Sequence, residues 1–387
     1  MRFTQEYSEE QENFRNQVKE KLKKHKSLEN FSVDSKLEYL GKQGWLIPSF
    51  GIKQDGVSLS EDLSRILFEE LENAGLLQYI DSNISKFHQA ISSEINAEYK
   101  DEWLHLLASG NLTAWVPLIN QGSSPDPDEF NIIAFEDGDE YVLNGRGVFV
   151  GRGENPGLIW TLARINQNQP ILNNIIGLMV PGNQENLIVE NIIGPMGNTI
   201  HSVSYENVRI SRSCVIGSSG DSLELFQSIM SQPTEFDYGI NNNRVLSDLI
   251  IFATQVDSDQ TRLIDDVVIQ QSVMKIYALN HISKLFQARD HWLSKSNKDI
   301  TYHRAQTRKW QKETALQLAK ITRDIMGIYA LLGDKEPNVP ANGRFLAQQM
   351  DTILDPRIAN AMESDSELIA IEVGLINLRI NKESNAS

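Results

Sequence analysis

Cysteine is almost absent from this sequence, and its scarcity removes a common means of stabilising a fold. Cys214 is the one cysteine in 387 residues, so no internal disulfide can form. That composition is typical of a reducing compartment. The seven histidines show no metal-ligand spacing, which argues against a metal site.

Long apolar runs are also missing. No stretch reaches the ~20 apolar residues needed to cross a bilayer, so we expect no membrane span. The acidic start of the chain lacks the apolar core of a signal peptide, and a cytoplasmic protein is therefore expected. Positive charge is scarce too: Asp and Glu outnumber Lys and Arg by 52 to 36, for a net charge of −16. This balance argues against a nucleic-acid-binding function.

Hydrophobic residues, in contrast, make up 40% of the chain, and its length predicts two or three packed units. Near the start, Phe14, Val18 and Leu22 recur at four-residue spacing, which indicates a helix over residues 8–24. Ser8 and Gln11 fit a capping box at its beginning. Further helical patterns lie at residues 33–44, 60–75, 101–107, 223–230, 267–294, 305–332 and 343–350.

The middle of the chain changes to a β pattern. Residues 136–140 give a hairpin turn signal. Short strands are predicted at residues 113–119, 131–135, 141–145, 147–151, 158–164, 175–180, 187–193 and 202–210. Such regular spacing favours a sandwich or barrel over a parallel Rossmann sheet. The sequence therefore predicts an α+β chain with an N-terminal α-helical domain (1–111), a middle β-barrel or sandwich domain (112–217) and a C-terminal four-helix-bundle-like domain (218–387).

Local motifs within this layout resemble those of the acyl-CoA dehydrogenase family. Residues 138–145 read GDEYVLNG, close to the family's GDEYxxNG hairpin, and lead to Phe149 and later to Ala163-Arg164. Residues 203–208, VSYENV, resemble its FEDV strand. The similarity extends over nearly the whole chain, and it implies an FAD-dependent flavoprotein of that family's three-part fold.

The resemblance also implies a reaction and a catalytic base. Family members oxidise the α,β bond of an acyl-CoA thioester: a carboxylate removes the α proton, and the β hydrogen leaves as hydride to FAD. Residues 362–368, MESDSEL, resemble the family's YEGTxxI segment and place Glu363 on the base. Such a base must be close and desolvated. The alternative is that Glu363 is one acid in an acidic helix start, beside Asp365 and Glu367.

The same resemblance assigns flavin contacts in the β domain. Phe149 matches an aromatic that packs on the isoalloxazine ring, and Gly151 stands where the family has a hydroxyl residue. The loop that matches TEPxAGSD puts Ile119 and Pro125 at its hydroxyl positions. Ser123 and Ser124 are near enough to substitute for the missing hydroxyls, and Leu118 would offer a backbone contact.

Two more positions fall in the helical C-terminal region. Gln270 stands where an Arg is expected to bind the FAD pyrophosphate of a neighbouring subunit, and Gln lacks its charge. Gly327 keeps one glycine of the family's QxxGG, whose Gln is replaced by Asp324. An acid near a pyrophosphate would repel it.

Three functions remain open on this sequence. The first is an FAD-dependent acyl-CoA dehydrogenase that uses Glu363, with electron-transferring flavoprotein as the acceptor implied by resemblance. The second is a flavin-poor, non-catalytic partner subunit of a heteromeric acyl-CoA dehydrogenase, which the substitutions at Ile119, Pro125 and Gln270 suit. The third is oxygen-dependent flavin chemistry, which no residue selects. A flavin site shared between subunits implies a homo- or hetero-oligomer.

Overall fold

The computed structural model divides the chain into two compact units, residues 1–239 and 240–387. It describes residues 7–24, 32–48, 59–81, 83–95, 97–118, 130–165, 174–193, 199–217, 221–231, 243–255, 261–296, 302–333 and 336–353. The predicted boundaries of three sequence domains remain a prediction.

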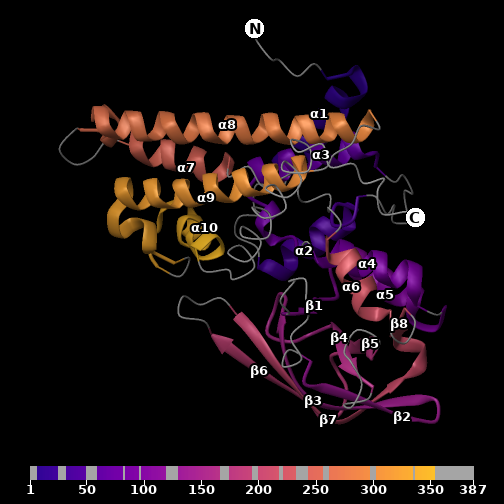
Figure 1. The fold of residues 1–387 in the computed structure, drawn as a ribbon. Helices are drawn as coiled ribbons and strands as arrows, with labels where there is room; N and C mark the ends of the chain where they lie inside the picture. The colour runs from indigo at the N-terminus through magenta and orange to yellow at the C-terminus, as the bar shows by residue number, and fades with distance from the viewer. Residues whose placement is uncertain are drawn as a thin grey trace, which may run out of the picture. The chain divides into compact units, whose positions relative to one another are not determined.

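The first unit begins with a group of helices (Figure 1), and their buried apolar side chains belong to one core cluster. They are α1 (Glu9–Lys24), α2 (Val33–Lys42), α3 (Glu61–Asn73), the short η2 (Leu77–Tyr79), α4 (Asn83–Glu94) and α5 (Ala97–Ser109). The predicted capping box is confirmed: Ser8 N–H donates to Gln11 Oε1 at 2.9 Å, and Gln11 N–H donates to Ser8 Oγ at 3.2 Å. Val18 of α1 is only 2% exposed, so the four-residue spacing read from the sequence does mark the buried face.

The strands of this unit form one mixed sheet. They are β1 (Ala114–Pro117), β2 (Ile132–Asp137), β3 (Glu140–Val150), β4 (Leu158–Arg164), β5 (Ile175–Pro181), β6 (Leu187–Ile193), β7 (Thr199–Ser211) and, after η5 (Arg212–Cys214), β8 (Val215–Ile216). The order is β6-β7-β3-β1-β4-β5-β8, and β2 pairs with both β3 and β4. The pairs β1·β4 and β2·β4 are parallel, and the others are antiparallel.

One strand prediction was wrong. Two short strands were expected, at residues 141–145 and 147–151, but β3 is one continuous strand of 11 residues. Its register against β7 shifts between Leu143 and Asn144, which is a bulge. Gly145 has φ +126°, and a Cβ there would overlap Asn131 O and lie 2.9 Å from Ile132 Cα. The glycine therefore bends the strand and admits a close backbone, and it does not end the strand.

Helix α6 (Ser222–Ser231) and helix α4 are joined to the sheet through Trp160 of β4. The Trp160 ring makes edge contacts with Phe226 at 5.0 Å and Phe87 at 5.8 Å between centroids. All three side chains are almost completely buried. One apolar core thus connects the helices and the sheet of this unit.

The second unit is helical. It contains α7 (Asn243–Thr254), η7 (Leu263–Asp265), α8 (Val267–Lys295), α9 (His303–Met326), η8 (Gly327–Leu331), η9 (Pro340–Gly343) and α10 (Arg344–Ile353). At about 1.5 Å per residue the 29-residue α8 spans about 43 Å, and α9 runs antiparallel beside it (Figure 1). The helix predicted over residues 305–332 ends earlier, because Gly327 takes φ +57° and caps α9.

Candidate functional site

The predicted site residues are only partly within the described structure. Ile119, Ser124, Pro125 and Glu363 lie outside the described residues, so their roles stay predictions. The other predicted residues divide between the units: Leu118, Phe149 and Gly151 lie in the first, and Gln270 and Gly327 in the second.

Phe149 and Leu118 come together at the pairing of β1 with β3. Pro117 stands opposite Phe149 in this antiparallel pair, and Leu118 N–H donates to Val148 O at 2.8 Å. The Phe149 ring is 1% exposed and contacts the ring of Tyr205, with centroids 6.5 Å apart. Phe149 is therefore a core residue in this structure, with no open ring face, and the Leu118 N–H already has an acceptor.

Gly151 follows directly after β3, where a side chain would have no room. A Cβ added there would overlap Trp115 Cδ1 and lie 2.7 Å from Trp115 Cγ and 2.8 Å from Ala114 O. Trp115 is completely buried, and its Nε1–H donates to Arg152 O at 2.8 Å. The hydroxyl that the resemblance expects at position 151 is thus replaced by a glycine that admits the Trp115 indole.

His201 of β7 completes this group, and the sequence patterns did not single it out. Its ring stacks on Trp115, with centroids 3.6 Å apart and an interplanar angle of 11°. His201 Nδ1 lies 2.8 Å from Asn191 Oδ1, and His201 Nε2 lies 3.1 Å from Gly151 O. Burial lowers the pKa of His201, while the contact with the Gly151 carbonyl acts in the opposite direction. A neutral imidazole donates through only one nitrogen, so the tautomer decides which contact is the hydrogen bond.

These contacts test whether FAD fits the described positions of the first unit. An isoalloxazine ring needs an open aromatic face and free donors for its oxygen and nitrogen edge. Phe149 offers no open face, Leu118 N–H is already bonded, and Gly151 is covered by Trp115. The described members of the predicted flavin set therefore do not fit the ring.

In the second unit, Gln270 lies exposed on the first turn of α8. Gln270 N–H donates to Asp266 O at 2.9 Å. The Asp266 carboxylate caps the helix: its Oδ1 accepts from Val268 N–H at 2.7 Å and Ile269 N–H at 3.4 Å. A pyrophosphate at this helix start would meet the Asp266 carboxylate, and Gln270 adds no positive charge, so these two residues do not fit that group either.

Gly327, at the other predicted position, serves as the C-cap of α9 with φ +57° and ψ −129°. A Cβ built there has no neighbour within 4 Å, so backbone conformation and not close packing requires the glycine. Asp324, one turn earlier, is exposed. Gly327 therefore has a structural role that needs no ligand.

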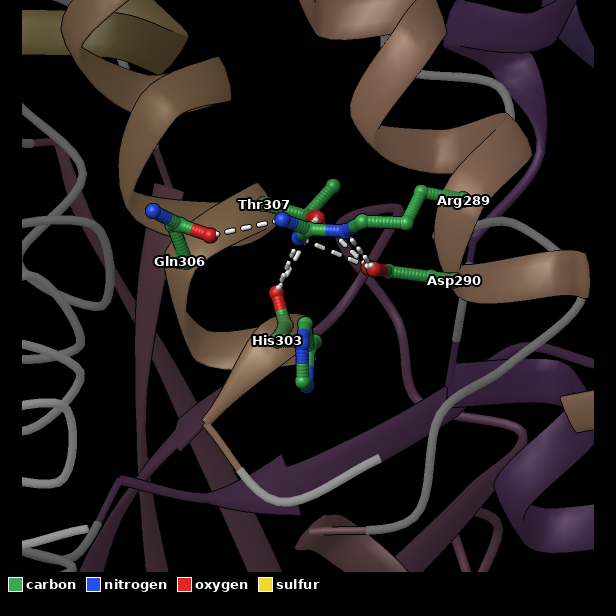
Figure 2. Close-up of polar contacts among 5 residues, drawn as sticks. All are labelled: Arg289, Asp290, His303, Gln306 and Thr307. Atoms are coloured by element: carbon green, nitrogen blue, oxygen red, sulfur yellow. Dashed lines mark hydrogen bonds and ion pairs between the residues drawn. The ribbon is translucent and has the colours of Figure 1, made fainter. Parts of the chain in front are cut away.

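A polar cluster in the second unit joins α8 to α9 (Figure 2). Arg289 donates to Asp290 Oδ1 from Nε at 3.2 Å and from Nη2 at 3.1 Å, and to Gln306 Oε1 at 2.8 Å. Arg289 Nη2 also reaches His303 O at 3.2 Å, and Thr307 Oγ1 donates to Asp290 Oδ2 at 2.5 Å. Asp290 is 5% exposed, so the cluster satisfies a buried carboxylate and fixes the two helices.

The described residues contain neither a helix suited to span a membrane nor a cluster suited to bind a metal. Among the helices that the structure describes, none combines the length and apolar character needed to cross a membrane. The same residues hold no group of three or more His, Cys, Asp or Glu side chains suited to a metal ion.

Comparison with solved structures identifies the fold. No protein-family model and no curated protein matches the sequence. The ChsE4-ChsE5 complex from Mycobacterium tuberculosis is similar over 96% of this chain and 98% of that chain, with a TM-score of 0.73 and 18% identity. The Tcur3481-Tcur3483 steroid ACAD is similar over 98% and 99%, with a TM-score of 0.75 and 17% identity.

An acyl-CoA dehydrogenase from Geobacillus kaustophilus gives the same result, with 96% of this chain and 99% of that chain covered, a TM-score of 0.72 and 18% identity. The matched 96 to 98% of this chain spans its leading helices, its mixed sheet and the helices that follow it. The fold expected from the GDEYVLNG hairpin and its surroundings is confirmed: this chain has the acyl-CoA dehydrogenase fold.

Proposed function

We propose that this chain is a subunit of an acyl-CoA dehydrogenase-type oxidoreductase, which oxidises the α,β bond of an acyl-CoA thioester with FAD. The observation that carries the proposal is similarity over nearly the full length of both chains, at TM-scores of 0.72 to 0.75. One fold can support many reactions, so the reaction is inferred and must be measured.

In the first form of the proposal, the chain is itself the enzyme and Glu363 is its base. An α proton beside a thioester is weakly acidic, so its removal needs a desolvated carboxylate within hydrogen-bonding reach. Electron-transferring flavoprotein is the proposed acceptor. Glu363 and three flavin-contact positions lie outside the described residues, and this form rests on the sequence resemblance.

In the second form, the chain is the flavin-poor partner in a heteromeric enzyme. Its support is the closed environment of Phe149, Trp115 and Gly151, together with the carboxylate of Asp266 near Gln270. The names ChsE4-ChsE5 and Tcur3481-Tcur3483 each join two proteins. The described geometry supports this second form better.

The experiment is a turnover assay with short-, medium- and long-chain acyl-CoA substrates and an artificial electron acceptor. The purified chain is assayed with added FAD and, separately, after co-expression with a flavin-binding subunit of the same fold. Turnover in either preparation supports the reaction class. Its absence from both, with every substrate, would contradict the proposed function.

Glu363→Gln identifies the base, because Gln keeps the shape of Glu but cannot accept the α proton. Glu367→Gln is the matched control, since it removes an acid from the same segment. Loss of turnover in the first variant alone assigns Glu363 as the base. Equal activity of both variants would remove Glu363 from the mechanism.

A further inference from the structure

We propose that the first unit of this chain does not bind the isoalloxazine ring of FAD, because Trp115, His201 and Phe149 close the predicted position. We call these three side chains the aromatic lock. The inference rests on the proposed function and deepens it: the flavin of the working enzyme is held by a second, flavin-loaded subunit of the same fold.

The first step concerns space. Gly151 is where the resemblance expects a flavin-contacting hydroxyl, but a Cβ there would overlap Trp115 and come within 2.8 Å of Ala114 O. Trp115 cannot simply turn away, because it is completely buried and Nε1–H is bonded to Arg152 O. Gly151 and the Trp115 indole therefore form a size-matched pair. A serine at position 151 would require a smaller side chain at position 115.

The second step concerns the aromatic surfaces. A flavin ring gains affinity by stacking on a ring whose face is open in the free protein. In this structure the Trp115 ring stacks on His201, and the Phe149 ring packs inside the sheet near Tyr205. Phe149 is 1% exposed, and Trp115 and His201 are 0% exposed, so the lock keeps no face available for a ligand.

The third step concerns hydrogen bonds. The Leu118 N–H and the Trp115 Nε1–H both have acceptors within the protein. A flavin edge would have to displace these bonds and leave buried groups unpaired, which opposes binding. The described residues provide no compensating gain.

The fourth step concerns charge, and it applies to the second unit alone. The position expected to hold a pyrophosphate-binding Arg is Gln270, and the helix-start donors beside it are already bonded to the Asp266 carboxylate. Gln supplies no positive charge to offset that carboxylate. The adenosine pyrophosphate half of FAD is therefore opposed at this helix start as well.

The binding experiment titrates FAD with the purified full-length chain, and it follows quenching of flavin fluorescence and retention of flavin during ultrafiltration. The expected result is no saturable binding, and a preparation whose flavin absorption disappears on desalting. A cooperative unfolding transition shows that the tested protein is folded. Stoichiometric, saturable FAD binding would overturn the inference.

A double-variant cycle tests the lock itself through the midpoint of denaturant unfolding. Gly151→Ser should lower the midpoint strongly, while Gly333→Ser, where the nearest neighbour is the Leu346 side chain at 3.7 Å, is the matched control with little change. Trp115→Ala should lower it as well, because it leaves a cavity. The double variant should lose clearly less than the sum of the single losses, and additive losses would refute the size-matched pair.

Failure of this inference differs from failure of the proposed function. If the chain binds FAD and oxidises an acyl-CoA alone, the lock proposal is wrong and the oxidoreductase proposal stands. If the chain binds no FAD and turnover appears only with a flavin-loaded subunit, both are supported. If FAD does not bind and turnover is absent with that subunit too, the proposed function is wrong. The proposal that the first unit does not bind the isoalloxazine ring then still stands.

Discussion

At the scale of single residues, His88 on α4 offers a test of burial. Desolvation lowers its pKa from 6.5 to about 4. The folded state then binds fewer protons than the unfolded state at any pH between these values. His88 therefore contributes a stability loss that begins as the pH falls below about 6.5 and grows toward pH 4.

We expect the free energy of unfolding to fall by about 1 to 2 kcal/mol from this residue between pH 7 and pH 5, after discounting for its partial exposure. His88→Gln should remove that part of the pH dependence in urea titrations at the two pH values. Gln89→Ala, at an exposed position of the same helix, is the control. An unchanged pH dependence in His88→Gln would show that the imidazole is solvated.

Ala341 tests backbone strain. Its φ is +52°, and Asn342 and Gly343 also have positive φ, so three successive residues of η9 are left-handed. Alanine in that region is strained by about 1 kcal/mol, whereas glycine is not.

Ala341→Gly should therefore stabilise the protein, by up to about 1 kcal/mol, measured by denaturant unfolding. Ala278→Gly, in the exposed face of α8, should destabilise by about 1 kcal/mol, because glycine is a poor helix former. A loss of stability in both variants would rule out strain at Ala341.

From the sequence, the candidate site was predictable only where one short segment contains all of the residues concerned. The family resemblance predicts a flavin-contacting hydroxyl at position 151, and this sequence has a glycine there. Its physical reason is Trp115, 36 residues earlier, and the stack on His201 is 50 residues later than Gly151. Such a pairing is set by strand register, and one sequence contains no local signal for it.

At the scale of secondary elements, the buried carboxylate of Asp290 holds α8 and α9 together through Arg289 and Thr307 (Figure 2). Removing a buried acid leaves its cationic partner without compensation. Arg289 is 30% exposed, so water offsets part of that cost.

We expect Asp290→Ala to lower the free energy of unfolding by about 2 to 4 kcal/mol. Asp265→Ala removes the exposed ion pair with Arg262 and should leave stability unchanged within error. Chemical denaturation of both variants provides the measurement. Equal effects would mean that burial does not set the contribution of Asp290.

Most long elements were predictable from periodicity, but the helices α4 and α7 were not. Strands β4 and β6 begin and end where the sequence predicted, as their apolar runs are bounded by turn residues. Helix α4 was not predicted, because its serines are poor helix formers and its apolar positions are few. In the structure Ile84, Phe87 and Ile91 of α4 are buried, so tertiary packing stabilises this helix.

At the scale of the whole molecule, most buried apolar residues of the described ranges fall in two clusters, and each cluster belongs to one unit. Two cores predict two unfolding transitions in calorimetry. Trp160→Ala removes a ring that contacts Phe87 and Phe226 and should cost about 3 to 5 kcal/mol in the first unit.

Trp160→Ala should therefore move one transition, and Asp290→Ala should move the other. Trp292→Ala, which truncates a 52% exposed ring, is the control and should shift neither by much. A single transition that both core variants move together would show that the units unfold as one cooperative body.

The order of strands in the sheet also sets when the chain can fold during its synthesis. Strand β3 has its longest pairing with β7, so Glu140 can pair only after Ser211 has been synthesised. Strand β5 gains its second neighbour only with Val215 and Ile216 of β8. Until then the apolar strands β4 and β5, buried in the finished protein, emerge from the ribosome with incomplete cover. Distant pairing slows folding and lengthens exposure to aggregation. Growth at low temperature weakens hydrophobic association between unfinished chains and should thus raise the yield of native chain.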